Sequence, residues 1–449
     1  MTDLLQDVAD HVVQRARRKG AAAADALIRE QETFSVTVRM GEVETLKEAV
    51  SRNLRVRVFV GNRTATSQTS DLSLPIVTSL VDETVEMAKL TSEDGSGGLP
   101  EAELYRTDFP NLEINDPTWN DLKPEQRIEW ARRAEAAAFH ADPAIQNSEG
   151  GMFEYVRTRT VVANTHEFIG AYEGTEGSLA VVPIARSEAG MQRDYWASAS
   201  RRRDRIETPE EVGRRAAARA VRRLGARKVK TCRAPVVFDP LAAQTLINHV
   251  FQAASGDAVY RKNSFLGDQL GQETAAPIVT ILDDARMTGG LGSAPFDDEG
   301  VPTQTTPVVE RGILRNYLHS AYTARKLGAR PTGNGSRHAT GAVGVGPTNF
   351  FLMPGEPPPE EIVSSVQSGL FVVELIGFGV NTVTGDFSKG AVGLWIENGR
   401  LTYPVHEITI AGNLRQMLCD IEMIGNDLTF IGQVAAPTMK IRSMVISGE

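Results

Sequence analysis

The chain has 449 residues, of which 41% are hydrophobic and 23% are charged. This length suits two or three domains, and the composition is typical of a globular protein rather than of a disordered one. Lysine and arginine number 48 against 57 aspartates and glutamates, which gives a formal net charge of −9. Because nucleic-acid binding usually needs a basic surface, we expect no direct contact with nucleic acid.

The cysteines and the start of the chain indicate a compartment. Cys232 and Cys419 lie far apart in the sequence and make no disulfide framework, which suits a reducing environment. The first residues are acidic and lack the pattern of a signal peptide. No apolar run approaches the roughly 20 residues that a membrane span needs. We therefore expect a cytoplasmic protein that does not contact a membrane.

Residues 1–95 are predicted to form a helix, antiparallel strands and a closing helix. Gly20 is expected to end the first helix. Apolar residues then alternate with polar ones along two segments, a period that indicates strands with one wet face; they are Phe34, Val36 and Val38, and Leu54, Val56 and Val58. Residues 96–120 are rich in Ser, Gly, Pro and acidic residues and read as a linker.

The same order recurs in residues 121–228. Pro124 opens a helix, strand-like runs follow, and Thr208-Pro209 starts a second closing helix with a capping-box glutamate at Glu211. This recurrence suggests an internal duplication of a helix–strands–helix unit.

Residues 229–449 are predicted to form a mainly antiparallel β domain. Asn398-Gly399 between two apolar runs is typical of a type I′ hairpin. One longer helix is expected from the cap Asp239 to a point near Gly256. The fold class is therefore α+β, with a duplicated N-terminal region followed by a mainly β C-terminal domain.

A search for catalytic residues finds no complete active site. Of the seven histidines, none has a second histidine three to five residues away, as a zinc-binding helix would require. His166 and His406 are each followed by a glutamate, but both are expected on strands. No Gly-x-Ser-x-Gly elbow occurs, and Cys232 and Cys419 are expected to be small core residues.

An acidic cluster remains open to two interpretations. It consists of Asp283, Asp284, Asp297, Asp298 and Glu299. Carboxylates of this kind could bind Mg²⁺ or Ca²⁺ through oxygen ligands. The alternative, which we favour, is a solvated turn.

Several long motifs follow one another along the C-terminal half of the chain. They are Phe296–Gly300, Ala324–Gly328, Pro331–Gly335, Gly377–Gly390, Trp395–Gly399, Tyr403–Asn413 and Ile424–Leu428. In this order they resemble the TldD/PmbA peptidase family, formerly called modulators of DNA gyrase. Together with the order of helices and strands, the resemblance covers essentially the whole chain and implies the family fold.

In catalytic members of that family a helix carries His-Glu-x-x-x-His, and a cysteine near the C-terminus adds a third zinc ligand. Matching the Gly-Asp that follows their motif to Gly256-Asp257 places Ile247 and Gln252 at the histidine positions and Asn248 at the glutamate. Residues 429–439 contain no cysteine. Isoleucine cannot coordinate a cation, and asparagine cannot act as the general base. We therefore expect neither a catalytic residue nor a metal site in this chain.

The resemblance implies a TldE/PmbA-like, non-metal-binding subunit of a TldD/TldE-type zinc metallopeptidase. In that assembly the zinc and the hydrolysis belong to a TldD-like partner, and the substrates are extended, unfolded peptides. This chain would need no cofactor of its own. A homodimer is an open alternative when the partner is absent.

Polar residues in loops at family-like positions are expected to contact the partner or the substrate. They are Asp298, Glu299, Asn334, Arg337, His338, Asn381 and Asp386. The alternative is that these residues only shape tight turns. Two other functions also stay open: an independent hydrolase that uses the acidic cluster, and a regulatory protein that binds gyrase or another protein.

Overall fold

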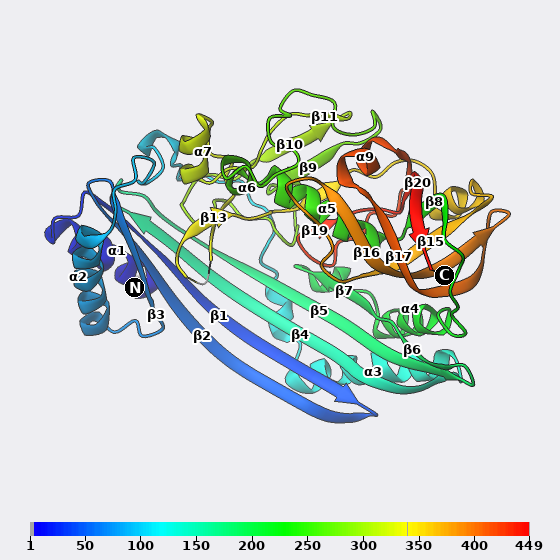
Figure 1. Ribbon diagram of the computed structural model, residues 1–449. Helices are drawn as coiled ribbons and strands as arrows, with labels where there is room; N and C mark the ends of the chain where they lie inside the picture. The colour runs from blue at the N-terminus through cyan, green and yellow to red at the C-terminus, as the bar shows by residue number, and fades with distance from the viewer. Residues whose placement is uncertain (1–3, 339, 449) are drawn as a thin grey trace.

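The N-terminal half of the chain is built around one long, curved antiparallel sheet (Figure 1). The computed structural model describes residues 4–338 and 340–448. In this sheet the strands lie in the order β3-β2-β1-β4-β5-β6, and β7 also pairs with β5. Their bounds are Ala23–Arg39 (β1), Glu42–Val60 (β2), Arg63–Thr69 (β3), Ile145–Asn164 (β4), Ile169–Ser187 (β5), Gly190–Arg193 (β6) and Trp196–Ser200 (β7). Since β1 pairs with β4 from Asp25 to Val38, the two helix–strands–helix units share this sheet.

Two pairs of helices cover opposite ends of one face of the sheet (Figure 1). Helices α1 (Leu4–Arg18) and α2 (Leu74–Leu90) pack on Ile28 of β1, and α3 (Pro124–Ala141) and α4 (Pro209–Val221) pack on Phe34, Val36 and Val38 of the same strand. All four strand residues have even numbers, so the period of two places them on one face. The odd-numbered face is left for the C-terminal domain, whose Phe296 packs against Leu27.

The C-terminal domain contains two larger sheets and one central helix. One sheet has the order β17-β16-β15-β8-β20-β18, the other has the order β11-β10-β9-β14-β19, and β12 pairs with β13 in a small hairpin. Most pairs are antiparallel; β8 with β15 and β14 with β19 are parallel. Helix α5 (Pro240–Ala254) packs into the main core of this domain.

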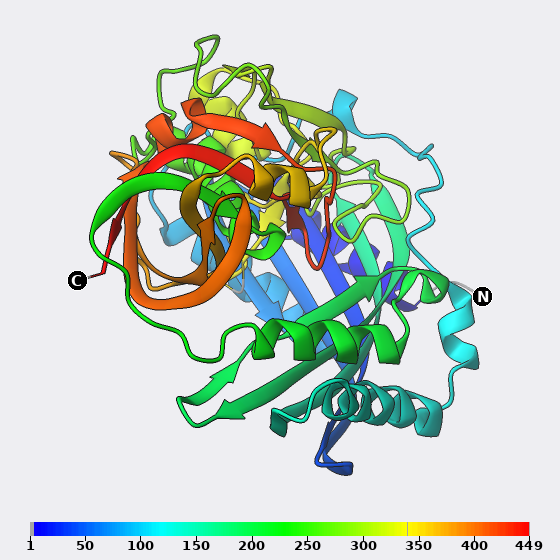
Figure 2. The same cartoon turned by 90° about the vertical axis from the view of Figure 1, so that its right-hand side faces the viewer.

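Among its described residues, the C-terminal domain contains the strands from β8 to β20 and four shorter helices besides α5. The strands are Cys232–Phe238 (β8), Ile281–Asp284 (β9), Thr305–Glu310 (β10), Ile313–Leu314 (β11), Gly335–Arg337 (β12), Val343–Val345 (β13), Phe350–Leu352 (β14), Ser368–Ile376 (β15), Asp386–Glu397 (β16), Arg400–Asn413 (β17), Ile421–Ile424 (β18), Val434–Ala435 (β19) and Met439–Ser447 (β20). The helices are Gly256–Tyr260 (α6), Ala321–Leu327 (α7), Pro359–Ser364 (α8) and Leu414–Cys419 (α9). Figure 2 shows this domain above the end of the N-terminal sheet that carries the β5–β6 hairpin. The α+β class is confirmed, whereas the predicted division into domains and linker stays a prediction.

Local signals in the sequence correspond to the observed ends of elements. Thr208 and Glu211 form the reciprocal capping box of α4, and the Asp239 side chain accepts a hydrogen bond from the Ala242 amide at the start of α5. Asn398 and Gly399 have φ angles of 50° and 74°, as the type I′ hairpin between β16 and β17 requires. Among the described residues, no helix has the length and apolar character of a membrane span.

Buried ion pairs join the N-terminal sheet to the C-terminal domain. The Arg57 guanidinium of β2 donates to Asp25 of β1 (Nε–Oδ2, 3.0 Å) and to Glu299 (Nη2–Oε1, 2.9 Å). Arg337 of β12 also pairs with Asp25. Burial by itself would raise the pKa of Asp25, but Arg337 and Arg57 lower it below its usual value. We call Asp25, Arg57, Glu299, Asp298 and Arg337 the interdomain charge cluster; all five are buried.

The interdomain charge cluster predicts that two arginine substitutions differ strongly in their effect on the free energy of unfolding. Removing one member of a buried ion pair leaves its partner charged and unpaired, so Arg337→Met should lower the free energy of unfolding by about 3–5 kcal/mol. The matched control is Arg133→Met, because Arg133 pairs with Glu210 on the surface; such pairs contribute about 1 kcal/mol or less. Equilibrium unfolding in urea measures both losses. Equal small losses would show that the cluster contributes little to stability.

Candidate functional site

The seven residues predicted to bind a partner or substrate lie in two places. Asp298, Glu299, Asn334 and Arg337 are buried between the N-terminal sheet and the C-terminal domain, and His338 is exposed beside them. Asn381 and Asp386 lie in and just after the exposed loop between β15 and β16. The structure therefore brings five of the seven together and separates the other two. Their role in binding stays a prediction.

The buried residues are occupied by contacts within the chain. Asp298 pairs with Arg29 and accepts the Arg337 amide (N–Oδ2, 2.8 Å). The second oxygen of Glu299 accepts the Ala321 amide at the start of α7 (N–Oε2, 2.7 Å). These contacts fix the loop that connects the two layers and leave the carboxylates few free lone pairs.

Asn334 and Asp283 form a second buried set of contacts. The Asn334 amide donates to Asp283 (Nδ2–Oδ2, 2.6 Å) and to the Gly346 carbonyl (3.0 Å), and the Thr348 amide donates to the other Asp283 oxygen (2.8 Å). Burial, the largest effect, raises the pKa of Asp283 to about 6 although these hydrogen bonds lower it. The set holds together the loops around residues 334, 346 and 348.

The favoured interpretation of the acidic cluster as a solvated turn is wrong. Four of the five members, Asp283, Asp297, Asp298 and Glu299, are buried, because backbone amides and arginines from distant segments compensate their charges, and Asp284 is half-buried. The alternative of a Mg²⁺ or Ca²⁺ site finds no support either. Across residues 4–338 and 340–448, no group of three or more His, Cys, Asp or Glu side chains could hold a metal ion.

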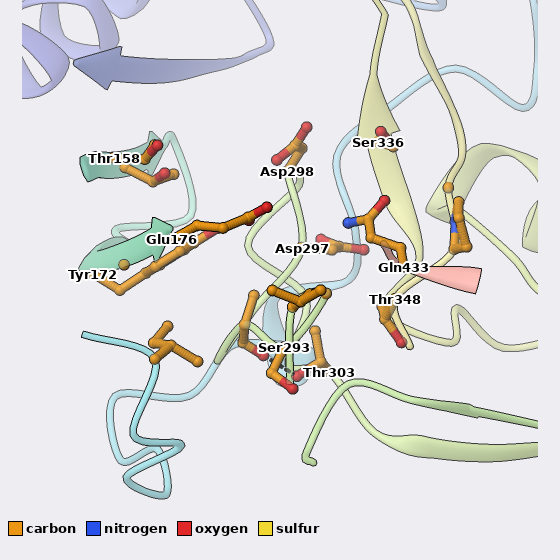
Figure 3. A pocket seen from close by; sticks show the side chains of 18 of the residues that line it. Thr158, Tyr172, Glu176, Ser293, Asp297, Asp298, Thr303, Ser336, Thr348 and Gln433 are labelled. Atoms are coloured by element: carbon orange, nitrogen blue, oxygen red, sulfur yellow. Dashed lines mark hydrogen bonds between the residues drawn. The ribbon is translucent and has the colours of Figure 1, made fainter. Parts of the chain in front are cut away.

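A pocket of about 630 Å³ lies between the N-terminal sheet and loops of the C-terminal domain. Figure 3 shows Glu176 and Tyr172 reaching from the strands toward Asp298, with Gln433 and Ser336 on the opposite wall. Burial raises the pKa of Glu176, while Arg201 lowers it and Glu154 raises it further. Burial and the adjacent Glu299 also raise the pKa of Asp297 well above its usual value. The pocket contains more acidic than basic groups, since Glu154, Glu176, Asp297 and Asp298 line it against Arg29 and Arg201.

Hydrogen bonds to the side chains of Asn381 and Asp386 fix the loop that precedes β16. The Asn381 oxygen accepts the amides of Val383 (2.9 Å) and Thr384 (3.3 Å). Asp386 accepts the Thr384 hydroxyl (2.7 Å). The loop so fixed presents Phe378, whose side chain is fully exposed.

The side chains of helix α5 have neither the chemistry nor the orientation that a zinc site requires. Ile247 has no exposed surface and belongs to the main core of the C-terminal domain. Gln252 is exposed, and its side-chain oxygen accepts a hydrogen bond from the His249 ring (Nδ1–Oε1, 3.1 Å). Burial lowers the pKa of His249. The residues present do not fit a catalytic zinc ion, because one ligand position is an apolar core position and the base position is an amide, Asn248.

Two further expectations are corrected by the structure. His166 lies in the turn between β4 and β5, where Glu167 has a positive φ of 64°, and not on a strand. Cys419 ends the short helix α9 and is exposed, because Met417 and Leu418 supply the buried side of that helix. His406 lies on β17, as expected.

Sequence reasoning missed Asp25, Arg29 and Arg57. They lie on strands whose alternating pattern shows only that one face is polar. The signal that could have found them is the charge at three positions on the face opposite the apolar residues. That signal does not distinguish a solvated face from a buried, ion-paired one.

The raised pKa of Asp283 predicts a pH-dependent contribution to stability. Since its folded-state pKa of about 6 exceeds the ordinary value of 3.8, the stabilisation is present below about pH 4 and disappears as the pH rises through 6. The free energy of unfolding of the unmodified chain, relative to Asp283→Asn, should therefore rise by about 2 kcal/mol from pH 7 to about pH 4.5. Urea unfolding at the two pH values measures it. A difference that is independent of pH would contradict the assignment.

The orientation of α5 predicts that histidine is tolerated at position 252 but destabilises the chain at position 247. Ile247→His places an imidazole in the apolar core and should lower the free energy of unfolding by more than about 2 kcal/mol. Gln252→His is the matched control on the exposed side and should change it by less than about 0.5 kcal/mol. Thermal or urea unfolding compares the two variants. Tolerance of histidine at both positions would mean that Ile247 does not face the core.

Three domains of one known protein family match the chain over most of its length. Residues 24–89 match the PmbA/TldA metallopeptidase domain 1, residues 117–224 match the central domain, and residues 231–448 match the C-terminal domain.

Individual relatives agree with these matches. Metalloprotease PmbA of Escherichia coli O157:H7 is 36% identical, over 99% of this chain and 96% of that protein. The crystal structure of a candidate DNA gyrase modulator from Thermotoga maritima superimposes with a TM-score of 0.88 at 28% identity, over 99% of this chain and all of that one. TldE from Thermococcus kodakarensis shares the fold, with a TM-score of 0.89 at 21% identity over 98% of this chain and all of that one. The chain belongs to the PmbA/TldD metallopeptidase family.

Proposed function

We propose that this chain is the non-catalytic, TldE/PmbA-like subunit of a zinc metallopeptidase that acts on unfolded peptides in the cytoplasm. Its partner would be a TldD-like subunit that carries the zinc ligands. Zinc bound in that partner supplies an activated water for hydrolysis of the peptide bond. The present chain would complete the path along which an extended peptide reaches that water.

The complete burial of Ile247 carries this proposal. A zinc site on α5 would need a polar ligand where the core of the C-terminal domain requires an apolar side chain. The absence of a zinc ligand at position 247 therefore follows from the packing of the domain and involves more than the exchange of one side chain. Membership of a metallopeptidase family together with a helix that cannot hold the metal supports a role beside a metal-bearing relative.

The independent-hydrolase alternative has less support. The acidic cluster that it would use is committed to Arg29, Arg57 and backbone amides. A regulatory role toward gyrase rests on the name of the Thermotoga maritima relative. Its test is co-purification from native extract, in which gyrase would be recovered with this chain.

Reconstitution with a His-Glu-x-x-x-His homologue from the same genome tests the proposal. We expect a one-to-one complex by size-exclusion chromatography with light scattering. Cleavage of a fluorogenic unfolded peptide should rise at least about tenfold over either chain alone, since both subunits would be needed to form the path. A partner variant without the motif glutamate should form the complex but cleave nothing.

Two outcomes would contradict the proposal. One is peptide cleavage by the isolated chain that a zinc chelator abolishes. The other is full activity of the metal-bearing homologue alone, with no complex formed when the present chain is added. Arg133→Met, a surface change on α3, serves as the control variant that should reconstitute normally.

A further inference from the structure

A second groove, of about 870 Å³, lies between the β5–β6 hairpin and the end of β15. One wall contains Met191 of β6 and the adjoining Tyr195, and the other contains Val373–Ile376 of β15. Leu241 and Thr245, from the first turns of α5, line it as well. The groove therefore begins beside the helix on which catalytic relatives carry their zinc motif.

Both strands present an unpaired edge to this groove. Strand β16 pairs with β15 up to Ile376 with one bulge at Val373, whereas β8 pairs with β15 only at Leu370–Val372. On the β8 side, Val373–Ile376 thus has no strand partner within the described part of the chain. Strand β6 ends its sheet and pairs only with β5 among the described residues. Unpaired strand edges bind other extended chains through backbone hydrogen bonds.

The charged groups of the groove are neutralised by one another. Arg223 pairs with Glu374 (Nη2–Oε2, 2.7 Å), and Arg193 pairs with Glu149 (Nη1–Oε2, 2.8 Å). Asp194 lies 3.7 Å from Arg223 (Oδ2–Nη1). The lining holds three carboxylates and two arginines, and Arg219 of α4 supplies a third positive charge 3.4 Å from Asp194 (Nε–Oδ2). An occupant consequently meets backbone edges, apolar walls and charges that are already paired.

Large apolar side chains are exposed on both walls. Met191 is 65% exposed, Tyr195 is 44% exposed and Ile376 is 51% exposed. A free backbone edge flanked by such side chains is suited to an extended chain with an apolar residue at every second position. Beyond the bulge at Val373, residues Glu374–Ile376 form a regular edge of about 10 Å, enough for about three residues of an added strand.

We propose that this groove docks an extended, unfolded peptide as an added strand on the free edge of β15. Recognition uses the peptide backbone and alternating apolar side chains, so it tolerates many sequences. The proposal rests on the proposed function in peptide hydrolysis and names the surface of this subunit that holds the substrate.

Binding to the isolated, full-length chain tests the groove without the partner. The probe is a fluorescein-labelled peptide of about ten residues with alternating valine and serine, and the readout is fluorescence anisotropy. We expect Ile376→Glu and Met191→Glu each to weaken binding at least about tenfold, because each places a charge on an apolar wall. Leu90→Glu is the matched control, since Leu90 is 88% exposed on α2, away from the groove.

A second probe separates backbone pairing from side-chain contact. The same peptide with its central amides N-methylated keeps its side chains but cannot form strand hydrogen bonds, so it should bind at least about tenfold more weakly. Circular dichroism melting confirms that each variant is folded; the substituted side chains are exposed.

Three results would overturn the groove proposal: no binding of the peptide, binding that neither groove variant changes, or binding that is indifferent to N-methylation. A change of oligomeric state in the Ile376→Glu variant without a change in peptide binding would also overturn it and indicate a second copy as the occupant. None of these results bears on cleavage by the reconstituted complex, which tests the proposed function separately.

Discussion

The interdomain charge cluster holds the N-terminal sheet against the C-terminal domain. Asp25 forms ion pairs with both Arg57, from the neighbouring strand, and Arg337, from the other domain. Each charge in the cluster has lost water and depends on its partners, so deleting one member leaves another buried and unpaired. Asp298 of the cluster also lines the polar pocket, so this joint and that pocket share a wall.

The packing of helix α5 is the observation behind the proposal that this chain holds no catalytic zinc. Its buried residues include Leu246, Ile247 and Val250, which join the main core of the C-terminal domain. A zinc ligand at position 247 would have to leave the core, and the core would lose an apolar side chain. The surface next to the helix is nevertheless open, because Leu241 and Thr245 line the apolar groove. This combination supports the proposal of a subunit without the zinc chemistry of the family but with a surface for peptide binding.

Local features of this chain were predictable, because short-range rules govern them. The hairpin turn at Asn398-Gly399, the capping box at Thr208 and the alternation around Phe34 each depend on a few neighbouring residues. The burial of Glu299 depends on Arg57, which is 242 positions away. Sequence proximity among five acidic residues therefore indicated a solvated turn, where the fold supplies arginines and amides. Cys419 was misplaced for a related reason: one turn of helix has both a buried and an exposed side, and only the tertiary fold decides which residue lies on each.

The central claim is that this chain cannot hold the family's catalytic zinc. Isothermal titration of the isolated, metal-free chain with zinc, followed by metal analysis after dialysis, tests it most directly. The account predicts less than about 0.1 zinc retained per chain, because Ile247, Asn248 and Gln252 supply no imidazole, thiolate or carboxylate, and the single imidazole of His249 binds zinc weakly. One zinc per chain, lost when Gln252 and His249 are both changed to alanine, would contradict it.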